Sequence, residues 1–168
     1  MTWTPPKTWV TNEPLTASDL NTHLRDNLLV LKAPASDQYS LNEGFNYTTS
    51  STNFVNIDGS LLSLPITTTG GDVLIGFNGT FSINTPLVLY LNVTVDGVQI
   101  ADNDGIGAWT LYAGAYFHMS FVRLKTGLSA GNHTFNLQWK VSANTATLYA
   151  GAGTSGGDVH PQFWIQEV

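Results

Sequence analysis

The stretch VLIGFNGTFSINTPLVLYLNVTV, residues 73–95, decides the fold. Its first half places apolar residues at 73, 75, 77, 81 and 83 between small or polar ones, and the alternation returns from Leu87 to Val95 after a break at Asn84-Thr85-Pro86. Alternation with a period of two over this length predicts two β-strands, each with one buried and one polar face. The rest of the chain must therefore supply a second apolar layer for these faces.

The chain after residue 35 continues in the same way. Asp96-Gly97 between two alternating runs is typical of a tight hairpin, and other glycine pairs separate the remaining runs. Eight to ten short strands with such turns predict an antiparallel jelly-roll β-sandwich over residues 35–168. The predicted strands are 45–49, 54–57, 61–66, 73–83, 87–95, 98–101, 116–124, 133–141, 145–150 and 162–168.

Residues 1–15 differ from this β region, because they contain three prolines and two tryptophans without helical spacing. This pattern predicts an extended arm. An arm of this length cannot bury Trp3 and Trp9 by itself, so both need a surface to pack against. Two alternatives are open: the arm folds back onto its own domain, or it docks on a neighbouring subunit.

Residues 16–34 carry the only clear helix signal in the sequence, together with a short linker. Thr16 is a suitable N-cap with Asp19 three residues later, and Pro34 ends the segment. So short a helix is marginal alone, and its apolar stripe must pack under its own β domain or join a helix bundle on an oligomer axis. In a bundle, Asn27 beside the stripe would fix the register. The stripe is Ala17, Leu20, Leu24, Leu28 and Leu31, and we predict that its leucines, with Trp3 and Trp9, mediate assembly and anchoring.

Composition narrows the function. Charged residues make up 11% of the chain, against roughly 25% in ordinary soluble domains, and the net charge is −6. A surface with few charged side chains and many Asn and Thr side chains is typical of an extracellular or particle-surface protein. The sequence has no basic stripe, no basic amphipathic helix and no apolar run of about 20 residues, so we expect neither nucleic acid nor membrane as a partner.

Two motifs resemble catalytic or metal sites by letter only. Residues 151–157, GAGTSGG, match both G-x-G-x-x-G and G-x-S-x-G, but each motif needs a helix directly after it and the following DVHP has no helical pattern. Asp102 and Asp104 resemble the start of a calcium loop that lacks its distal glutamate, so a solvated turn is favoured over a metal site. We therefore expect no enzyme activity, no catalytic residue, no metal and no cofactor.

Residues 8–28, TWVTNEPLTASDLNTHLRDNL, resemble an N-terminal module of bacteriophage and prophage virion proteins. In that group, a tryptophan, an arm and an A-x-x-L-N-x-x-L-R-D-N helix precede a β-rich head. Residues 128–139, LSAGNHTFNLQW, and 163–168, FWIQEV, are similar to strands of the jelly-roll heads of complement-type and tumour-necrosis-factor-like trimers. The resemblance implies a homotrimer on a phage particle and brings no catalytic residues.

The sequence thus predicts a structural virion protein, made in the host cytoplasm without a signal peptide. It would be a homotrimeric capsid decoration or tail-fibre head that binds other capsid or tail proteins. The alternative is a carbohydrate- or receptor-binding module at the tail tip, in which exposed aromatic residues stack on a host-surface glycan. The candidates for stacking are Trp109, Tyr112 and Tyr149. A depolymerase is least favoured, because no carboxylate pair is evident.

Overall fold

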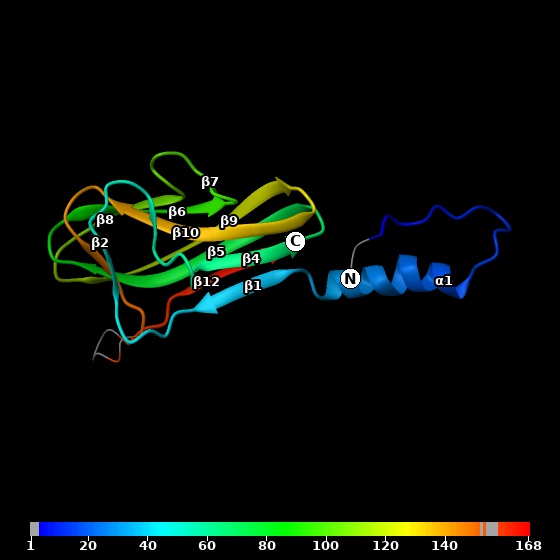
Figure 1. Cartoon of the computed structure of the whole chain (residues 1–168), viewed down its shortest axis with the longest axis horizontal. Coiled ribbons are helices and arrows are strands. Elements are labelled where there is room, and N and C mark those ends of the chain that lie inside the picture. Colours follow the sequence, from blue (N-terminus) through cyan, green and yellow to red (C-terminus); the bar gives the residue numbers. More distant parts are fainter. Residues whose placement is uncertain (1–3, 152, 154–157) are drawn as a thin grey trace.

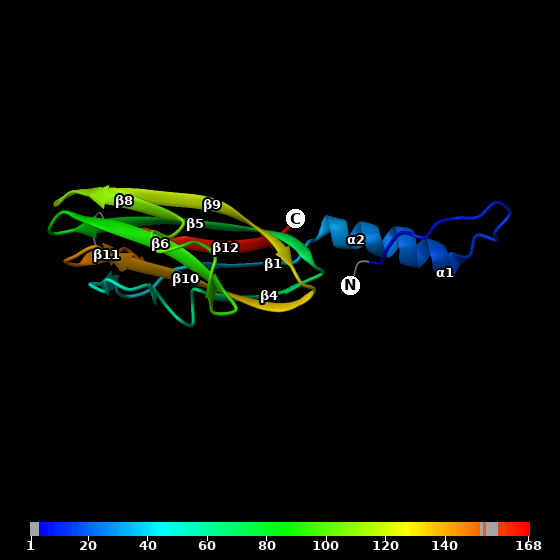
Figure 2. The ribbon, with the colours of Figure 1, turned by 90° about the horizontal axis from the view of Figure 1, so that it is seen from above.

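The computed structural model describes residues 4–151, 153 and 158–168. The molecule is elongated: a β-sandwich forms one end, and a helix with an extended arm beside it projects from the other (Figure 1). A view from above shows the two layers of the sandwich and the same projecting helix (Figure 2). The fold class predicted from the sequence, a mainly β antiparallel jelly roll preceded by an arm and a short helix, is confirmed.

Two antiparallel sheets make the sandwich. In the first sheet, β1, β12, β5 and β9 lie side by side in that order. Further along β5, β11 pairs with it in place of β12, and β2 pairs with β11. In the second, the order is β4-β10-β6-β8, with β3 and β7 pairing further along β10 and β6. Successive long strands pass between the two sheets, which is the arrangement of a jelly roll. The first sheet comprises β1 (Ser36–Ser40), β2 (Tyr47–Thr49), β5 (Gly71–Ile83), β9 (Tyr116–Leu128), β11 (Ala146–Leu148) and β12 (Gln162–Glu167), and the second comprises β3 (Val55–Asn56), β4 (Ser63–Thr68), β6 (Leu87–Val95), β7 (Val98–Gln99), β8 (Gly107–Leu111) and β10 (Gly131–Val141).

The core lies between the sheets and is built by the predicted alternation. On β5, Phe77 and Phe81 are buried, and the Phe81 ring lies 6.3 Å from that of Trp139 on β10. Each fully buried side chain of this size contributes roughly 1.5–3 kcal/mol to folding. The prediction of two long strands in residues 73–95 is confirmed by β5 and β6.

The turn at Asp96-Gly97 joins β6 to β7 as predicted, with φ of 52° and 82°. Positive φ at both central residues is the requirement of a tight type I′ hairpin. His133 on β10 secures this turn, because its Nδ1 lies 2.7 Å from Asp96 Oδ2 and its Nε2 lies 2.9 Å from the Ser129 carbonyl oxygen. The Asp96 and Ser129 acceptors together raise the pKa of His133, and the hydrogen bond from His133 lowers the pKa of Asp96.

Two strands were missed by the sequence analysis. β1 reads SDQYS, in which Tyr39 is the one large apolar residue, and β8 reads GAWTL beside a glycine-containing turn. Both are edge strands that pair on one side only, with β12 and β6 respectively. An edge strand buries less surface than a central one, so its sequence carries a weaker apolar pattern.

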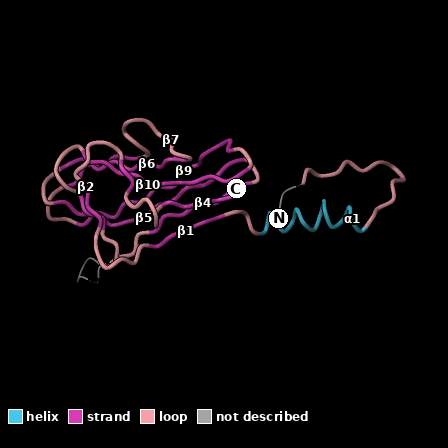
Figure 3. Tube along the Cα trace, in the orientation of Figure 1, coloured by secondary structure: helices cyan, strands magenta, loops and turns pink. Residues whose placement is uncertain are grey.

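One continuous helix runs from residue 17 to 32, in the segments α1 (Ala17–Leu20), η1 (Asn21–Asp26) and α2 (Asn27–Lys32) (Figure 3). The middle segment, η1, is π-helical. The predicted cap is confirmed: the Asp19 N–H donates to the Thr16 hydroxyl oxygen at 3.1 Å, and the hydroxyl donates to the Asp19 carboxylate at 2.6 Å. Across the part of the chain that the structure describes, no helix has the length and apolar character needed to cross a membrane.

Candidate assembly surface on the arm and helix

The arm lies along its own helix and is held there by Asn27. Asn27 Oδ1 accepts a hydrogen bond from the Thr4 N–H at 3.0 Å, and Asn27 Nδ2 donates to the Thr4 carbonyl at 2.8 Å. The same Nδ2 lies 3.2 Å from the His23 carbonyl, and the Asn27 side chain is almost fully buried. Asn27 therefore binds the arm of its own chain, whereas the sequence analysis considered it for the register of a bundle. Trp3 lies outside the described residues.

Lys7 joins the arm to the start of the helix. Its Nζ lies 2.5 Å from Glu13 Oε1 and 3.1 Å from Asp19 Oδ1. It also lies 4.7 Å from the centre of the Trp9 ring, a cation–π geometry. The hydrogen bond to Glu13, followed by the one to Asp19, raises the pKa of Lys7. The three charged side chains keep 21–28% of their surface in contact with solvent, which screens the ion pairs, so the network orients the arm more than it stabilises it.

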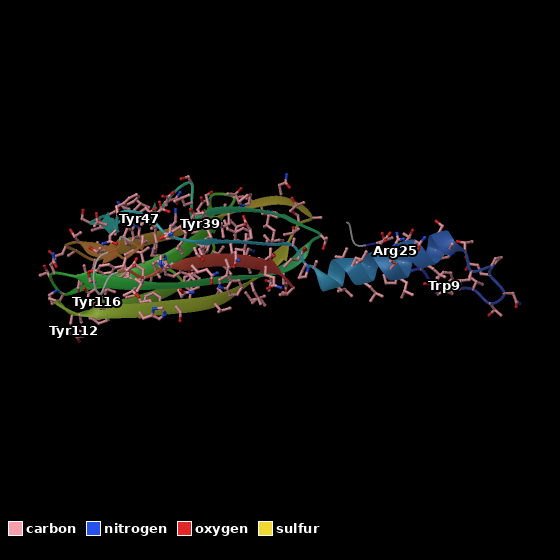
Figure 4. All side chains as sticks on the ribbon, turned by 90° about the horizontal axis from the view of Figure 1, so that it is seen from below. Trp9, Arg25, Tyr39, Tyr47, Tyr112 and Tyr116 are labelled. Carbon is pink, nitrogen blue, oxygen red and sulfur yellow. The ribbon has the colours of Figure 1, made fainter. Side chains whose placement is uncertain are left out.

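The apolar stripe of the helix is open to solvent. Leu24, Leu28 and Leu31 are 55%, 56% and 66% exposed, and Trp9 on the arm is 45% exposed. The helix projects away from the sandwich, so the structure does not place the stripe beneath the chain's own β-sandwich (Figure 1). Figure 4 shows Trp9 and Arg25 on this projecting part. Contiguous exposed apolar surface on a soluble protein marks an interaction site.

The π-helical segment η1 helps to keep the leucines of this stripe on one side of the helix. Leu20, Leu24 and Leu28 are spaced by four residues, and in an α-helix such side chains drift by about 40° around the axis per step. The wider π turn reduces this drift.

A groove of about 350 Å3 runs beside the stripe between helix and arm. Its apolar walls are Pro6, Trp9, Leu15, Leu20 and Leu24.

The helix meets the sandwich at a neck beside the chain's C-terminal strand. Val30 and Leu31 line a hollow of about 400 Å3 with Gln166 and Val168. At the same place, the nearly buried Glu167 carboxylate accepts hydrogen bonds from the Thr69 N–H at 2.7 Å and the Thr69 hydroxyl at 2.9 Å. The stripe therefore continues into a surface on the sandwich itself.

The aromatic residues proposed for sugar stacking do not form one cluster. Trp109 packs against the core with its ring over Gly107. Tyr112 is 65% exposed and lies at the end of the sandwich away from the helix (Figure 4). Tyr149 pairs with Tyr116, which the sequence analysis missed: their ring centres are 5.2 Å apart. Only the pairing of β5 with β9 and β11 could have revealed this contact.

Of the two motifs rejected at the sequence level, the structure describes the turn with Asp102 and Asp104 in full. The Lys140 ammonium donates to the Asn103 carbonyl and lies 4.7 Å from the Phe54 ring and 4.8 Å from the Tyr90 ring. The turn with Asp102 and Asp104 is thus held against the second sheet. Within residues 4–151, 153 and 158–168, no group of three or more His, Cys, Asp or Glu side chains is placed to hold a metal. Most of the Gly-rich motif, residues 152 and 154–157, lies outside the described residues.

No protein-family model matches the sequence, and no curated protein resembles it in sequence. Among solved structures, the chain is similar to a chain of the infectious bursal disease virus particle, at 13% identity over 79% of this chain, with a TM-score of 0.44. It spans 36% of the length of that viral chain. It is also similar to Eiger TNF from S. frugiperda, at 13% identity over 81% of this chain and 94% of that one, with a TM-score of 0.39. The jelly-roll assignment rests on the strand order and register of this chain.

Proposed function

We propose that this chain is a non-enzymatic structural protein of a bacteriophage virion. It forms a homotrimer, the arm and helix anchor it to its own copies and to capsid or tail proteins, and the sandwich is displayed on the particle. The observation that carries this proposal is the projecting arm–helix unit, whose leucine stripe and Trp9 are open to solvent. The resemblance of residues 8–28 to the N-terminal module of phage virion proteins supports the location on the virion.

The driving force of this assembly is the burial of apolar surface. Fully burying a leucine contributes roughly 1.5–3 kcal/mol, so a leucine that is already about half covered contributes roughly 1 kcal/mol more on assembly. Leu20, Leu24, Leu28, Leu31 and Trp9 together would contribute roughly 5 kcal/mol per subunit before the entropy cost of association. A free energy of this size holds the subunits together only if several copies associate at once or a second surface takes part.

The first experiment measures the mass of the purified full chain by analytical ultracentrifugation. We expect three times the 18.1 kDa of one chain. Leu24→Asp places a charge in the stripe and should give a monomer, because a buried unpaired carboxylate costs several kcal/mol. Ser18→Asp adds the same charge at an exposed position on another side of the helix and should leave the trimer intact.

The second experiment tests the anchoring role on particles. Phage that carry a copy lacking residues 1–32 should assemble without incorporating the truncated protein, while the Ser18→Asp protein should be incorporated normally. A monomeric wild-type chain would refute the trimer, and normal incorporation of the truncated protein would refute the anchoring role.

A further inference from the structure

Tyr116 and Tyr149 form a pair of tyrosine rings on the first sheet. Their ring centres lie 5.2 Å apart, and the ring planes are inclined by 56°. Tyr116 begins β9 and Tyr149 directly follows β11, so the two side chains come from strands that flank β5 on opposite sides. Among the described residues, this is the only pair of neighbouring rings in which both partners are tyrosines.

Ser82 on the middle strand, β5, lies between the two tyrosines. The register places Tyr116 opposite Ser82 on one side and Thr147 opposite it on the other, and Tyr149 is two residues further along on the same face as Thr147. The Ser82 hydroxyl oxygen lies 2.9 Å from the Tyr149 phenol oxygen. The Tyr149 N–H donates to the Thr80 carbonyl at 3.0 Å. A small side chain on the middle strand thus leaves room for the two rings to meet above it.

The hydroxyl ends of the two rings converge. A hydrogen bond with the Tyr149 phenol raises the pKa of Tyr116. In a tyrosine ring, the two carbons ortho to the hydroxyl lie at the same end as the hydroxyl itself. Contact between the phenols therefore also brings ortho carbons of the two rings together, and these are the atoms at which two phenoxyl radicals couple.

The pair is open to oxidants from solvent. Tyr116 is 58% exposed and lies at the end of the sandwich away from the helix (Figure 4). Sulfur side chains commonly compete for an oxidant, and their oxidation depends on exposure. This chain has no cysteine, and Met119 on β9 is buried. Without cysteine, no disulfide can join the strands, so a bond between tyrosines is the covalent cross-link that the geometry allows.

From this geometry we infer that Tyr116 and Tyr149 are a site of oxidative cross-linking, at which one covalent bond joins the two rings within a single chain. A haem peroxidase with hydrogen peroxide removes one electron and one proton from each phenol. The two phenoxyl radicals then form a carbon–carbon bond between ortho carbons. The hydrogen on each of these carbons moves to the phenol oxygen and restores the hydroxyl. The protein loses two hydrogen atoms in all, and one hydrogen peroxide is reduced to two waters.

The bond would tie β9 to β11 across β5. In the described part of the chain, β9 pairs with β5 alone, so it is held along one side only. A covalent cross-link stabilises a fold mainly by restricting the unfolded chain, and here it closes a loop from residue 116 to residue 149. For a loop of this length in a domain of this size, the melting temperature should rise by roughly 10 °C.

The experiment treats the full-length chain with a haem peroxidase and hydrogen peroxide. We expect the blue fluorescence of dityrosine in a product that migrates as one chain on a denaturing gel and has lost two hydrogen atoms by mass spectrometry. Trypsin cuts after Arg123 and Lys140, so the peptide of residues 33–123 should be joined to that of residues 141–168. Tyr149 is the only tyrosine in the second peptide, which identifies one end of the cross-link.

Three variants identify the other end. Tyr116→Phe and Tyr149→Phe each remove only a hydroxyl, and each should abolish the fluorescence and the joined peptides. Tyr112→Phe is the matched control, because Tyr112 is 65% exposed at the same end of the sandwich and should leave the cross-link unchanged. The melting temperature should rise on oxidation in the wild type and in Tyr112→Phe, but not in the other two variants.

Three results would overturn the inference: no dityrosine in the wild-type chain, unchanged dityrosine in Tyr116→Phe, or a cross-link that joins two chains instead of one. The inference concerns one subunit and does not depend on the proposed trimer. The native mass of the untreated chain tests the trimer separately, so the failure of one leaves the other standing.

Discussion

The contact between Asn27 and Thr4 allows a quantitative prediction about the arm. Two hydrogen bonds of 3.0 Å and 2.8 Å join the Asn27 amide to the Thr4 backbone in a nearly buried setting. A hydrogen bond of this kind contributes about 1 kcal/mol net. The Lys7 ion pairs add little because solvent still reaches and screens their partly exposed side chains. Asn27→Ala should therefore weaken docking of the arm by about 2 kcal/mol, which raises the population of the released arm about 30-fold.

Limited trypsin digestion measures this population at Lys7. When an arm opens and closes faster than the protease cuts, the rate of cleavage follows the fraction of open molecules. The fragment of residues 1–7, quantified by mass spectrometry, should thus appear about 30-fold faster from Asn27→Ala than from the wild-type chain. Asn21→Ala is the matched control, because Asn21 is exposed on the same helix and should leave the rate unchanged. A wild-type rate in Asn27→Ala would refute the reasoning that this amide holds the arm.

Two further predictions concern the sandwich. Because its pKa is raised by Asp96, His133 stabilises the fold fully below its unfolded pKa of about 6.5, and this contribution is lost as pH rises through the higher folded pKa. The free energy of unfolding, measured by thermal denaturation between pH 5 and 9, should fall by about 1 kcal/mol in the wild type but not in His133→Gln. The same pH dependence in both proteins would disprove the coupling between His133 and Asp96. Gly76→Ala should cost about 1–3 kcal/mol because the new Cβ displaces the Trp164 ring, while Gly44→Ala, with no atom within 4 Å, should leave the melting temperature unchanged. Equal melting temperatures for both glycine variants would contradict the packing of Trp164.

The sequence predicted those elements whose signals are local. The alternation in residues 73–95 corresponds to β5 and β6, and Thr16 begins the helix as its side chain indicated. These signals need no knowledge of the partner, since a strand face and a helix cap are determined within a few residues. Edge strand β1 lacked such a signal, because most of its side chains face water.

Contacts between distant residues could not be predicted in this way. Asn27 and Thr4 are 23 positions apart, and Tyr116 and Tyr149 meet only because β9 and β11 both pair with β5. Asn27 illustrates the difficulty, because a polar residue beside a leucine stripe fits a bundle interior and an intramolecular clamp equally well. The geometry of the folded chain distinguishes the two uses.

The same limit applies to the question of which surfaces are covered. Periodicity identifies two faces for each strand of the first sheet and assigns the apolar one to the core, but it does not say whether the other face meets water. The helix shows the same limit, because its periodicity marks an apolar stripe without saying what covers it. In the folded chain Leu24 and Leu28 are more than half exposed, so the stripe is not covered by the chain's own sandwich. It is this geometry, and not the periodicity, that supports the proposed assembly.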